Sequence, residues 1–173
     1  MKTTLPVKIT SGAFALALTM VANVTLAQYP PASHLATSWW QWALETAASE
    51  NPLTDTTGQF AAVNQSDRVW FLAGNPGGTT VRTITVPSGK ALFFPIVNVF
   101  DAEDGIAVRG GRLFLVPRPV QVARTFVSSV IATAMGLSCE VDGSPFPITT
   151  ANLEQSTPFS LHDRSWSCGS IYS

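Results

Sequence analysis

The chain has 173 residues, of which 46% are hydrophobic and 12% are charged, and its formal net charge at pH 7 is −1. This composition excludes an intrinsically disordered chain, because such chains combine low hydrophobicity with high charge. It also argues against a nucleic-acid-binding surface that follows phosphates, since the ten Lys and Arg residues are scattered along the sequence. The length is typical of one globular domain.

The N-terminus predicts a secretory signal peptide. Lys2 and Lys8 form a positive n-region, residues 12–22 are mostly apolar and uncharged, and Thr25 and Ala27 offer small residues at a cleavage site. The alternative is an uncleaved anchor, but the apolar run is shorter than the ~20 residues that span a bilayer. We therefore expect a signal peptide over residues 1–27. The mature domain, 28–173, is expected to be secreted or periplasmic and to have no transmembrane span.

The first element expected in the mature chain is a helix that begins near Ser38 and is stopped by Asn51 and Pro52. Residues 29–31, Tyr-Pro-Pro, precede it as an extended lead-in, because proline cannot continue a helix. Ser38 and Gln41 have the spacing of a capping box. Helical periodicity gives the segment one face, formed by Trp39, Trp42, Ala43 and Thr46.

Short apolar or β-branched runs bounded by turn residues predict strands along the rest of the chain. These runs cover residues 69–73, 79–86, 91–100, 106–108, 113–116, 139–141 and 145–149. Residues 86–89, Val-Pro-Ser-Gly, fit a turn that joins two of the runs as a β-hairpin. The pairs Gly110-Gly111 and Asp142-Gly143 fit tight hairpin turns. Residues 120–135 predict a second helix, because apolar residues recur there at intervals of three and four before Gly136.

Strands therefore outnumber helices, and turn residues recur at intervals typical of antiparallel sheets. The predicted fold is mainly β or α+β, an antiparallel β-sandwich-like domain with two packed helices. The connections are too short for a doubly wound α/β fold.

Three segments resemble a family of secreted bacterial proteins to which no activity is assigned. They are Trp39–Ala43 (WWQWA), Val69–Gly74 (VWFLAG) and Val86–Asn98 (VPSGKALFFPIVN), and the resemblance spans about Ser38 to Gly143. It implies a secreted protein and brings no catalytic residues. In that family the chain continues through further strands after the Asp-Gly turn. The resemblance thus implies that this C-terminal end is truncated or altered.

The two cysteines, Cys139 and Cys168, both lie in the mature domain. Exported proteins meet an oxidising compartment in which such a pair usually closes. We expect a disulfide between them, and two unpaired thiols are the alternative.

Metal ligation has one candidate. A zinc site is not expected, because His34 and His162 are far apart and neither belongs to a ligand motif. Asp101, Glu103 and Asp104 bring three carboxylates within four residues, as an oxygen-ligated calcium requires. The alternative is an ordinary solvated loop, and no other cofactor is expected.

The tryptophans supply the sharpest binding hypothesis. Trp39, Trp40 and Trp42 cannot all face one side of a helix, so at least one is expected at the surface, where aromatic side chains mark interaction sites. Packing in the core is the alternative interpretation for these residues.

No catalytic motif is evident, because the chain has no Gly-x-Ser-x-Gly sequence and the turn explains Ser88. The leading hypothesis is a non-catalytic module that binds an extracellular or envelope ligand such as a glycan. One alternative is a hydrolase that pairs Glu45 with one of the carboxylates at 101–104. The other is a structural protein of the envelope. We expect a non-enzymatic role, because the sequence shows no nucleophile or metal set. The hydrolase stays an alternative, since carboxylate enzymes leave few sequence traces.

Overall fold

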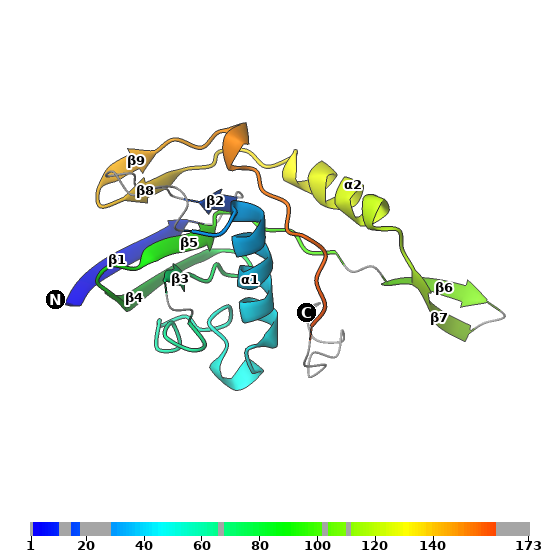
Figure 1. Cartoon of the computed structure of the whole chain (residues 1–173), viewed down its shortest axis with the longest axis horizontal. Coiled ribbons are helices and arrows are strands. Elements are labelled where there is room, and N and C mark those ends of the chain that lie inside the picture. Colours follow the sequence, from blue (N-terminus) through cyan, green and yellow to red (C-terminus); the bar gives the residue numbers. More distant parts are fainter. Residues whose placement is uncertain are drawn as a thin grey trace.

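A computed structural model describes residues 2–10, 15–17, 29–65, 68–101, 104–109 and 112–161 (Figure 1). For 2–10, 15–17, 104–109 and 113–117 the description is of the backbone. Two helices accompany strands that form small sheets (Figure 1). In the described ranges, no helix is long and apolar enough to cross a membrane.

Helix α1 spans Ala32–Glu45, so it begins before Ser38, where the capping box predicted its start. Pro31 occupies the N-cap position, and its rigid backbone leads directly into the first turn. The helix ends at Glu45, earlier than the predicted stop at Asn51 and Pro52, and the amide of Asn51 donates hydrogen bonds of 2.8 Å to the carbonyls of Ala43 and Thr46. The predicted apolar face is confirmed, because Trp39, Trp42, Ala43 and Thr46 are all buried. A short 3₁₀ helix, η2, follows at Ala48–Glu50.

The central sheet has the order β2-β5-β3. Strand β3 is Val69–Phe71, β5 is Ala91–Pro95 and β2 is Ala15–Ala17; β5 runs parallel to β3 and antiparallel to β2. Strand β4, Thr79–Pro87, pairs instead with β1, Lys2–Thr10. The predicted hairpin across residues 86–89 is therefore wrong. The turn is present, but it carries the chain from one sheet to another, and β5 takes its ladder partners from β2 and β3.

Two hairpins follow as predicted. Strands β6, Asp104–Arg109, and β7, Arg112–Pro117, pair across the predicted Gly-Gly turn and project beyond α2 in Figure 1. Strands β8, Cys139–Val141, and β9, Ser144–Phe146, pair across Asp142 and Gly143. Both turn residues have positive φ, 52° and 75°, as a two-residue hairpin of this kind requires.

Helix α2 spans Val120–Ile131 and ends four residues before Met135, the predicted end. Its buried residues are Ala123 and Ile131, whereas Val122, Phe126 and Val130 of the periodic pattern are exposed. The apolar spacing therefore predicted the helix correctly. The face that other elements cover, however, is the one with Ala123 and Ile131, next to the predicted apolar face. A 3₁₀ helix, η3, forms at Thr150–Asn152.

The α+β class is confirmed, but the β-sandwich is not. Within the described ranges the strands form one three-stranded and three two-stranded sheets rather than two sheets packed face to face. Periodicity predicts single strands well, whereas long-range contacts decide which strands pair.

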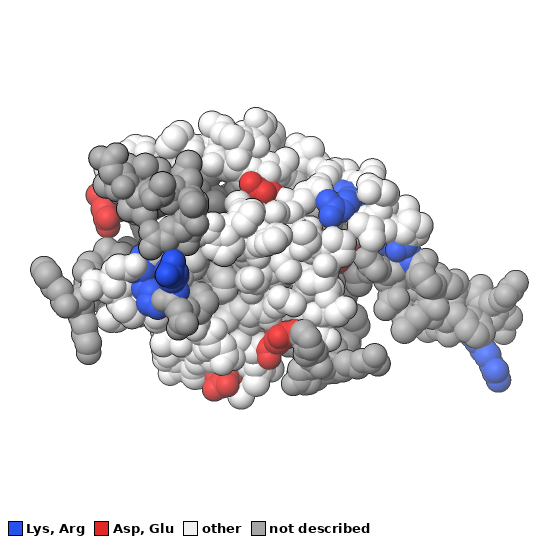
Figure 2. Space-filling view, in the orientation of Figure 1, with Lys and Arg blue, Asp and Glu red and all other residues white. Residues whose placement is uncertain are grey.

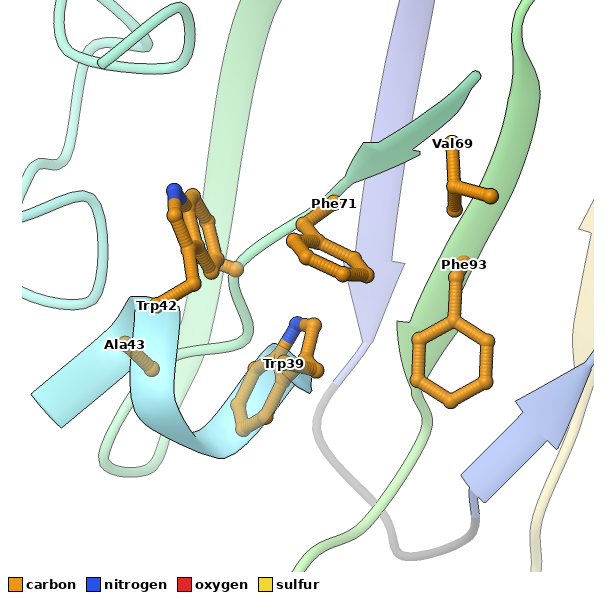
Figure 3. Packing of buried hydrophobic residues seen from close by; sticks show 7 residues of the cluster. Trp39, Trp42, Ala43, Val69, Phe71 and Phe93 are labelled. Atoms are coloured by element: carbon orange, nitrogen blue, oxygen red, sulfur yellow. The ribbon is translucent and has the colours of Figure 1, made fainter. Parts of the chain in front are cut away.

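The core lies on both faces of β3, as the unbroken apolar run in this strand suggests. On one face, α1 packs on the strands through the core cluster drawn in Figure 3, which consists of Trp39, Trp42, Ala43, Val69, Phe71, Ala73 and Phe93. On the other face Trp70, Leu72, Ile84 and Val86 form a second cluster. Phe93 is 3% exposed, while Phe94 packs against the second cluster, so the two rings point to opposite faces.

Candidate functional site

A cavity of about 410 Å³ lies between α1, α2 and the C-terminal part of the described chain. Its floor is the end of β5 together with residues 97–101, which continue from that strand. Residues 153–161 form its outer wall and run between the two helices in Figure 1. We call this space the α1–α2 pocket.

Aromatic side chains form one wall of the α1–α2 pocket. The ring of Trp40 lies 5.0 Å from that of Trp39 in an edge-to-face arrangement and 5.4 Å from that of Phe100. Trp39 is buried, and its indole N–H donates to the carbonyl of Leu72 over 2.9 Å. Trp40 is half-buried and Phe100 is 46% exposed. These two rings therefore still have surface to offer a ligand.

The opposite wall comes from α2 and is mainly apolar. It is formed by Val120, Ala123, Val127 and Ile131, which lie three to four residues apart and so share one face of the helix. Arg124 adds a charged group at the same wall. An apolar enclosure with a few polar groups is the usual composition of a small-molecule site.

Asp101 brings a carboxylate to the pocket. Its Oδ1 accepts a hydrogen bond of 3.0 Å from Nη1 of Arg118. Its Oδ2 is buried and has no hydrogen-bond partner among the described residues. An unsatisfied buried acceptor costs about 1–3 kcal/mol, so a donor from beyond the described residues would stabilise this oxygen.

Side-chain hydrogen bonds hold residues 153–161 against both helices. On the α1 side, the backbone N–H of Thr157 donates to Oγ1 of Thr37 over 3.1 Å, and the two hydroxyls lie 2.9 Å apart. On the α2 side, Nη1 of Arg124 donates to Oε1 of Gln155 over 2.6 Å. These contacts are largely exposed to solvent, and the segment has no regular secondary structure. The outer wall of the pocket is thus held more weakly than its floor.

The predicted binding tryptophans divide between the pocket and the core. Trp39 and Trp40 line the α1–α2 pocket, while Trp42 points into the core, where its indole N–H donates to the carbonyl of Val63 over 2.8 Å. Of the hydrolase candidates, Asp101 lines the pocket and Glu45 does not. Glu154, which the sequence did not single out, adds a second carboxylate to the lining.

The calcium prediction stays a prediction. Glu103 lies outside the described residues, and Asp104 is described as backbone in β6. The side chain of Asp101 pairs with Arg118, a cation that would repel a metal ion at the same carboxylate. Among the described side chains no group of three or more His, Cys, Asp or Glu residues could hold a metal ion.

The predicted disulfide also stays a prediction. Cys139 is half-buried and is bonded to no cysteine of the described ranges, and burial raises the pKa of its thiol. Its expected partner, Cys168, lies outside the described residues.

A second buried polar site surrounds Asp55 and Arg82, and in it every charged group has partners. Oδ1 of Asp55 accepts from the N–H and the hydroxyl of Thr57, both at 2.7 Å, and Oδ2 accepts from the N–H groups of Gly58 and Phe60 at 2.9 and 3.0 Å. Burial alone would raise the pKa of Asp55, but these hydrogen bonds outweigh it and lower the pKa from 3.8 to about 2. The carboxylate therefore organises its own loop.

The guanidinium of Arg82 joins that loop to the sheet. Its Nε donates to the carbonyl of Asp55, and its Nη1 donates to those of Ala73 and Gly74 at 2.7 and 2.9 Å. Burial lowers the pKa of Arg82, and the charge of Asp55 partly opposes this. With its donors occupied by backbone carbonyls, the group has a structural role.

Sequence reasoning missed Arg118, Arg124 and the wall formed by residues 153–161. Arg118 and Arg124 flank the start of α2, and the wall segment has neither periodicity nor a motif. Their proximity to Trp40 arises from tertiary contacts, so no local signal could have identified them.

Comparisons with known proteins return no relative. No family model, no curated protein and no solved structure matches this chain.

Proposed function

We propose that this chain is a non-catalytic binding module that takes a small, mainly apolar ligand into the α1–α2 pocket. One observation carries the proposal: a cavity of about 410 Å³ is bounded by the exposed faces of two aromatic rings and by one apolar face of α2. Ligand pockets typically measure about 300–1,000 Å³ and are lined mainly by hydrophobic and aromatic side chains. The volume favours a small molecule over a polymer.

The character of the lining refines the glycan hypothesis. An extended glycan chain presents many hydroxyl groups, each of which needs a polar partner once it is buried. The α1–α2 pocket offers a few polar side chains among mostly apolar ones, including Asp101, Arg124 and Gln155. It is therefore better matched to a ligand with an apolar body and few polar groups.

The setting we propose is the cell envelope or the extracellular medium. The expected signal peptide over residues 1–27 supports it, and the sparse charge on the face shown in Figure 2 is compatible with a role that does not involve nucleic acid. Expression with the native N-terminus in a secreting host should yield a product that begins at or near Gln28 and so lacks β1 and β2. Mass determination of the exported product checks this, and a membrane-bound product that retains residues 1–27 would contradict it.

A fluorescence titration tests the binding proposal. N-phenyl-1-naphthylamine is neutral and becomes fluorescent in an apolar environment, so it reports occupancy of the α1–α2 pocket. Val127 lines the pocket, and Val127→Phe should fill part of the space and weaken dye binding at least tenfold. Thr125→Phe is the matched control, because Thr125 is similar in shape to Val127, lies on the same helix and is exposed.

The control variant should bind the dye like the wild type. If the folded wild type does not bind the dye, or if both Phe variants bind it equally well, the pocket is not the binding site and the proposal fails. Circular dichroism melting of each variant separates loss of binding from loss of folding.

The carboxylate hydrolase is the second candidate, because Asp101 and Glu154 both line the pocket. Two carboxylates that face one cleft are the minimum set for glycoside hydrolysis. Turnover of chromogenic glycosides that is lost in both Asp101→Asn and Glu154→Gln would favour this candidate. Binding without turnover favours the non-catalytic module.

A further inference from the structure

We infer that the ligand of the α1–α2 pocket is a neutral ring compound that donates a hydrogen bond, of the alcohol or phenol class, and that Asp101 receives this bond. The inference rests on the proposed function and names the chemistry of the ligand. It combines the unsatisfied carboxylate oxygen with the aromatic wall beside it.

The polar part of the ligand follows from the state of Asp101. An ionised carboxylate only accepts hydrogen bonds, and here Oδ1 has the Arg118 donor while Oδ2 has no partner in the described part of the chain. The side chain is 14% exposed, and Oδ2 itself exposes less than 1 Å². Access of a ligand donor to Oδ2 requires rotation of the carboxylate about χ2, which is a soft torsion in Asp.

The charge of the ligand follows from the neighbours of that carboxylate. Arg118 already neutralises Asp101, and Arg124 adds a further positive charge at the pocket wall. Glu154, also in the lining, offsets Arg124, so the lining together with Arg118 has no net charge. Burial of an ammonium group at Asp101 would place it beside the Arg118 cation and would incur its desolvation cost. A neutral hydroxyl group would donate a hydrogen bond to Oδ2 without the desolvation cost of a charge.

The ring follows from Trp40 and Phe100. Their centroids lie 5.4 Å apart with planes inclined by 48°, and both rings retain exposed surface at the pocket. Aromatic faces pack favourably against a further ring in offset or edge-to-face geometry. Asp101 follows Phe100 directly in the chain, so ring contact and hydrogen-bond acceptor lie at one end of the pocket.

Four displacers of similar shape test the inference against bound N-phenyl-1-naphthylamine. They are 4-propylphenol, a neutral donor; 4-propyltoluene, without a polar group; 4-propylacetophenone, a neutral acceptor; and 4-propylbenzylammonium, a cation. A hydrogen bond to a charged group predicts that the phenol displaces the dye at about tenfold lower concentration than the toluene. The ammonium compound should be no better than the toluene.

Two isosteric variants assign the donor contact. In Asp101→Asn the amide oxygen faces Arg118, so an NH₂ group replaces Oδ2, and the preference should shift from the phenol to the acetophenone. Glu140→Gln is the matched control, since it neutralises an exposed carboxylate on β8 outside the pocket lining and should keep the phenol preference.

The outcomes separate this inference from the proposed function. If neither the dye nor any displacer binds the folded wild type, the proposed function fails. If all four displacers compete equally, if the ammonium competes best, or if Asp101→Asn keeps the phenol preference, binding stands and the inference is overturned. Should Asp101→Asn not fold, the ranking of the four compounds on the wild type still decides between a donor, an acceptor and a cation.

Discussion

Asp55 and Asp101 are both largely buried, each lies near an arginine, and their surroundings differ in one respect. Asp55 receives four hydrogen bonds from its own loop, two on each oxygen. Asp101 receives one bond on Oδ1 from Arg118, and no described residue donates to Oδ2. Both oxygens of the first carboxylate are hydrogen-bonded, whereas one oxygen of the second has no partner among the described residues.

This contrast separates the two carboxylates. Buried polar atoms are almost always paired, so a saturated carboxylate needs no explanation beyond stability, and an unpaired one does. The space beside each carboxylate agrees with this division: Asp55 borders a cavity of about 20 Å³, whereas Asp101 lines the α1–α2 pocket of about 410 Å³. Removing the first should affect folding, and removing the second should affect binding.

The largest effect is expected from Asp55→Ala. It leaves the N–H groups of Thr57, Gly58 and Phe60 without their acceptor and frees the loop that Arg82 holds against the sheet. We expect the free energy of unfolding to fall by about 3–5 kcal/mol. Urea denaturation measures it. Asp101→Ala is the control and should lower the free energy of unfolding by no more than about 1 kcal/mol, as loss of a partly exposed ion pair does. Equal losses in the two variants would contradict the difference between the two carboxylates.

Gly58→Ala tests the same loop through its backbone. Gly58 has a φ of +96°, and an added Cβ would lie 2.7 Å from the carbonyl oxygen of Thr83 and 2.9 Å from Cγ2 of Ile84. We expect a loss of about 2–4 kcal/mol from backbone strain and overpacking. Gly89→Ala isolates the strain, because Gly89 has a φ of +82° and nothing within 4 Å. Thermal melts should show a clearly larger loss of stability for Gly58→Ala than for Gly89→Ala. Equal losses would mean that the loop accommodates the added Cβ without a steric cost.

Acid should destabilise the protein through Asp55. Its folded pKa, about 2, lies below the ordinary value of 3.8, so its stabilisation is complete above pH 4 to 5 and is lost as the pH falls toward 2. The contribution is about 2 kcal/mol. Urea titrations at pH 5, 4, 3 and 2 should show this loss in the wild type and a shallower pH dependence in Asp55→Asn. An equally steep pH dependence in Asp55→Asn would contradict the assignment of this loss to Asp55.

The smallest effect is expected at the outer wall of the α1–α2 pocket. Thr37→Val removes the hydroxyl that meets Thr157 but keeps the side-chain shape. Because these hydrogen bonds are exposed, global stability should change by less than about 1 kcal/mol. Hydrogen exchange of residues 153–161 should become faster, while that of β3 stays unchanged. Unchanged exchange in both regions would mean that this contact does not hold the wall.

The sequence predicted the elements that depend on local chemistry. The apolar face of α1, the buried run of β3 and the pairing of β6 with β7 and of β8 with β9 follow from periodicity and from the turn residues between the strands. Trp40 could be expected to differ from Trp39, since neighbours on a helix point in different directions. These inferences do not depend on which distant segments of the chain contact each element.

Tertiary structure decided the rest, because the deciding contacts join residues far apart in the chain. The turn at residues 86–89 predicted a hairpin, yet β5 pairs with β3 and β2. Likewise, α2 buries the face of Ala123 and Ile131 and leaves Phe126 exposed, since the covering elements lie on that side. The pocket itself depends on residues 153–161, which reach Thr37 across 120 positions of sequence. Local propensity selects helices and strands, but the burial of one element against another determines which side chains meet, and so where a ligand can bind.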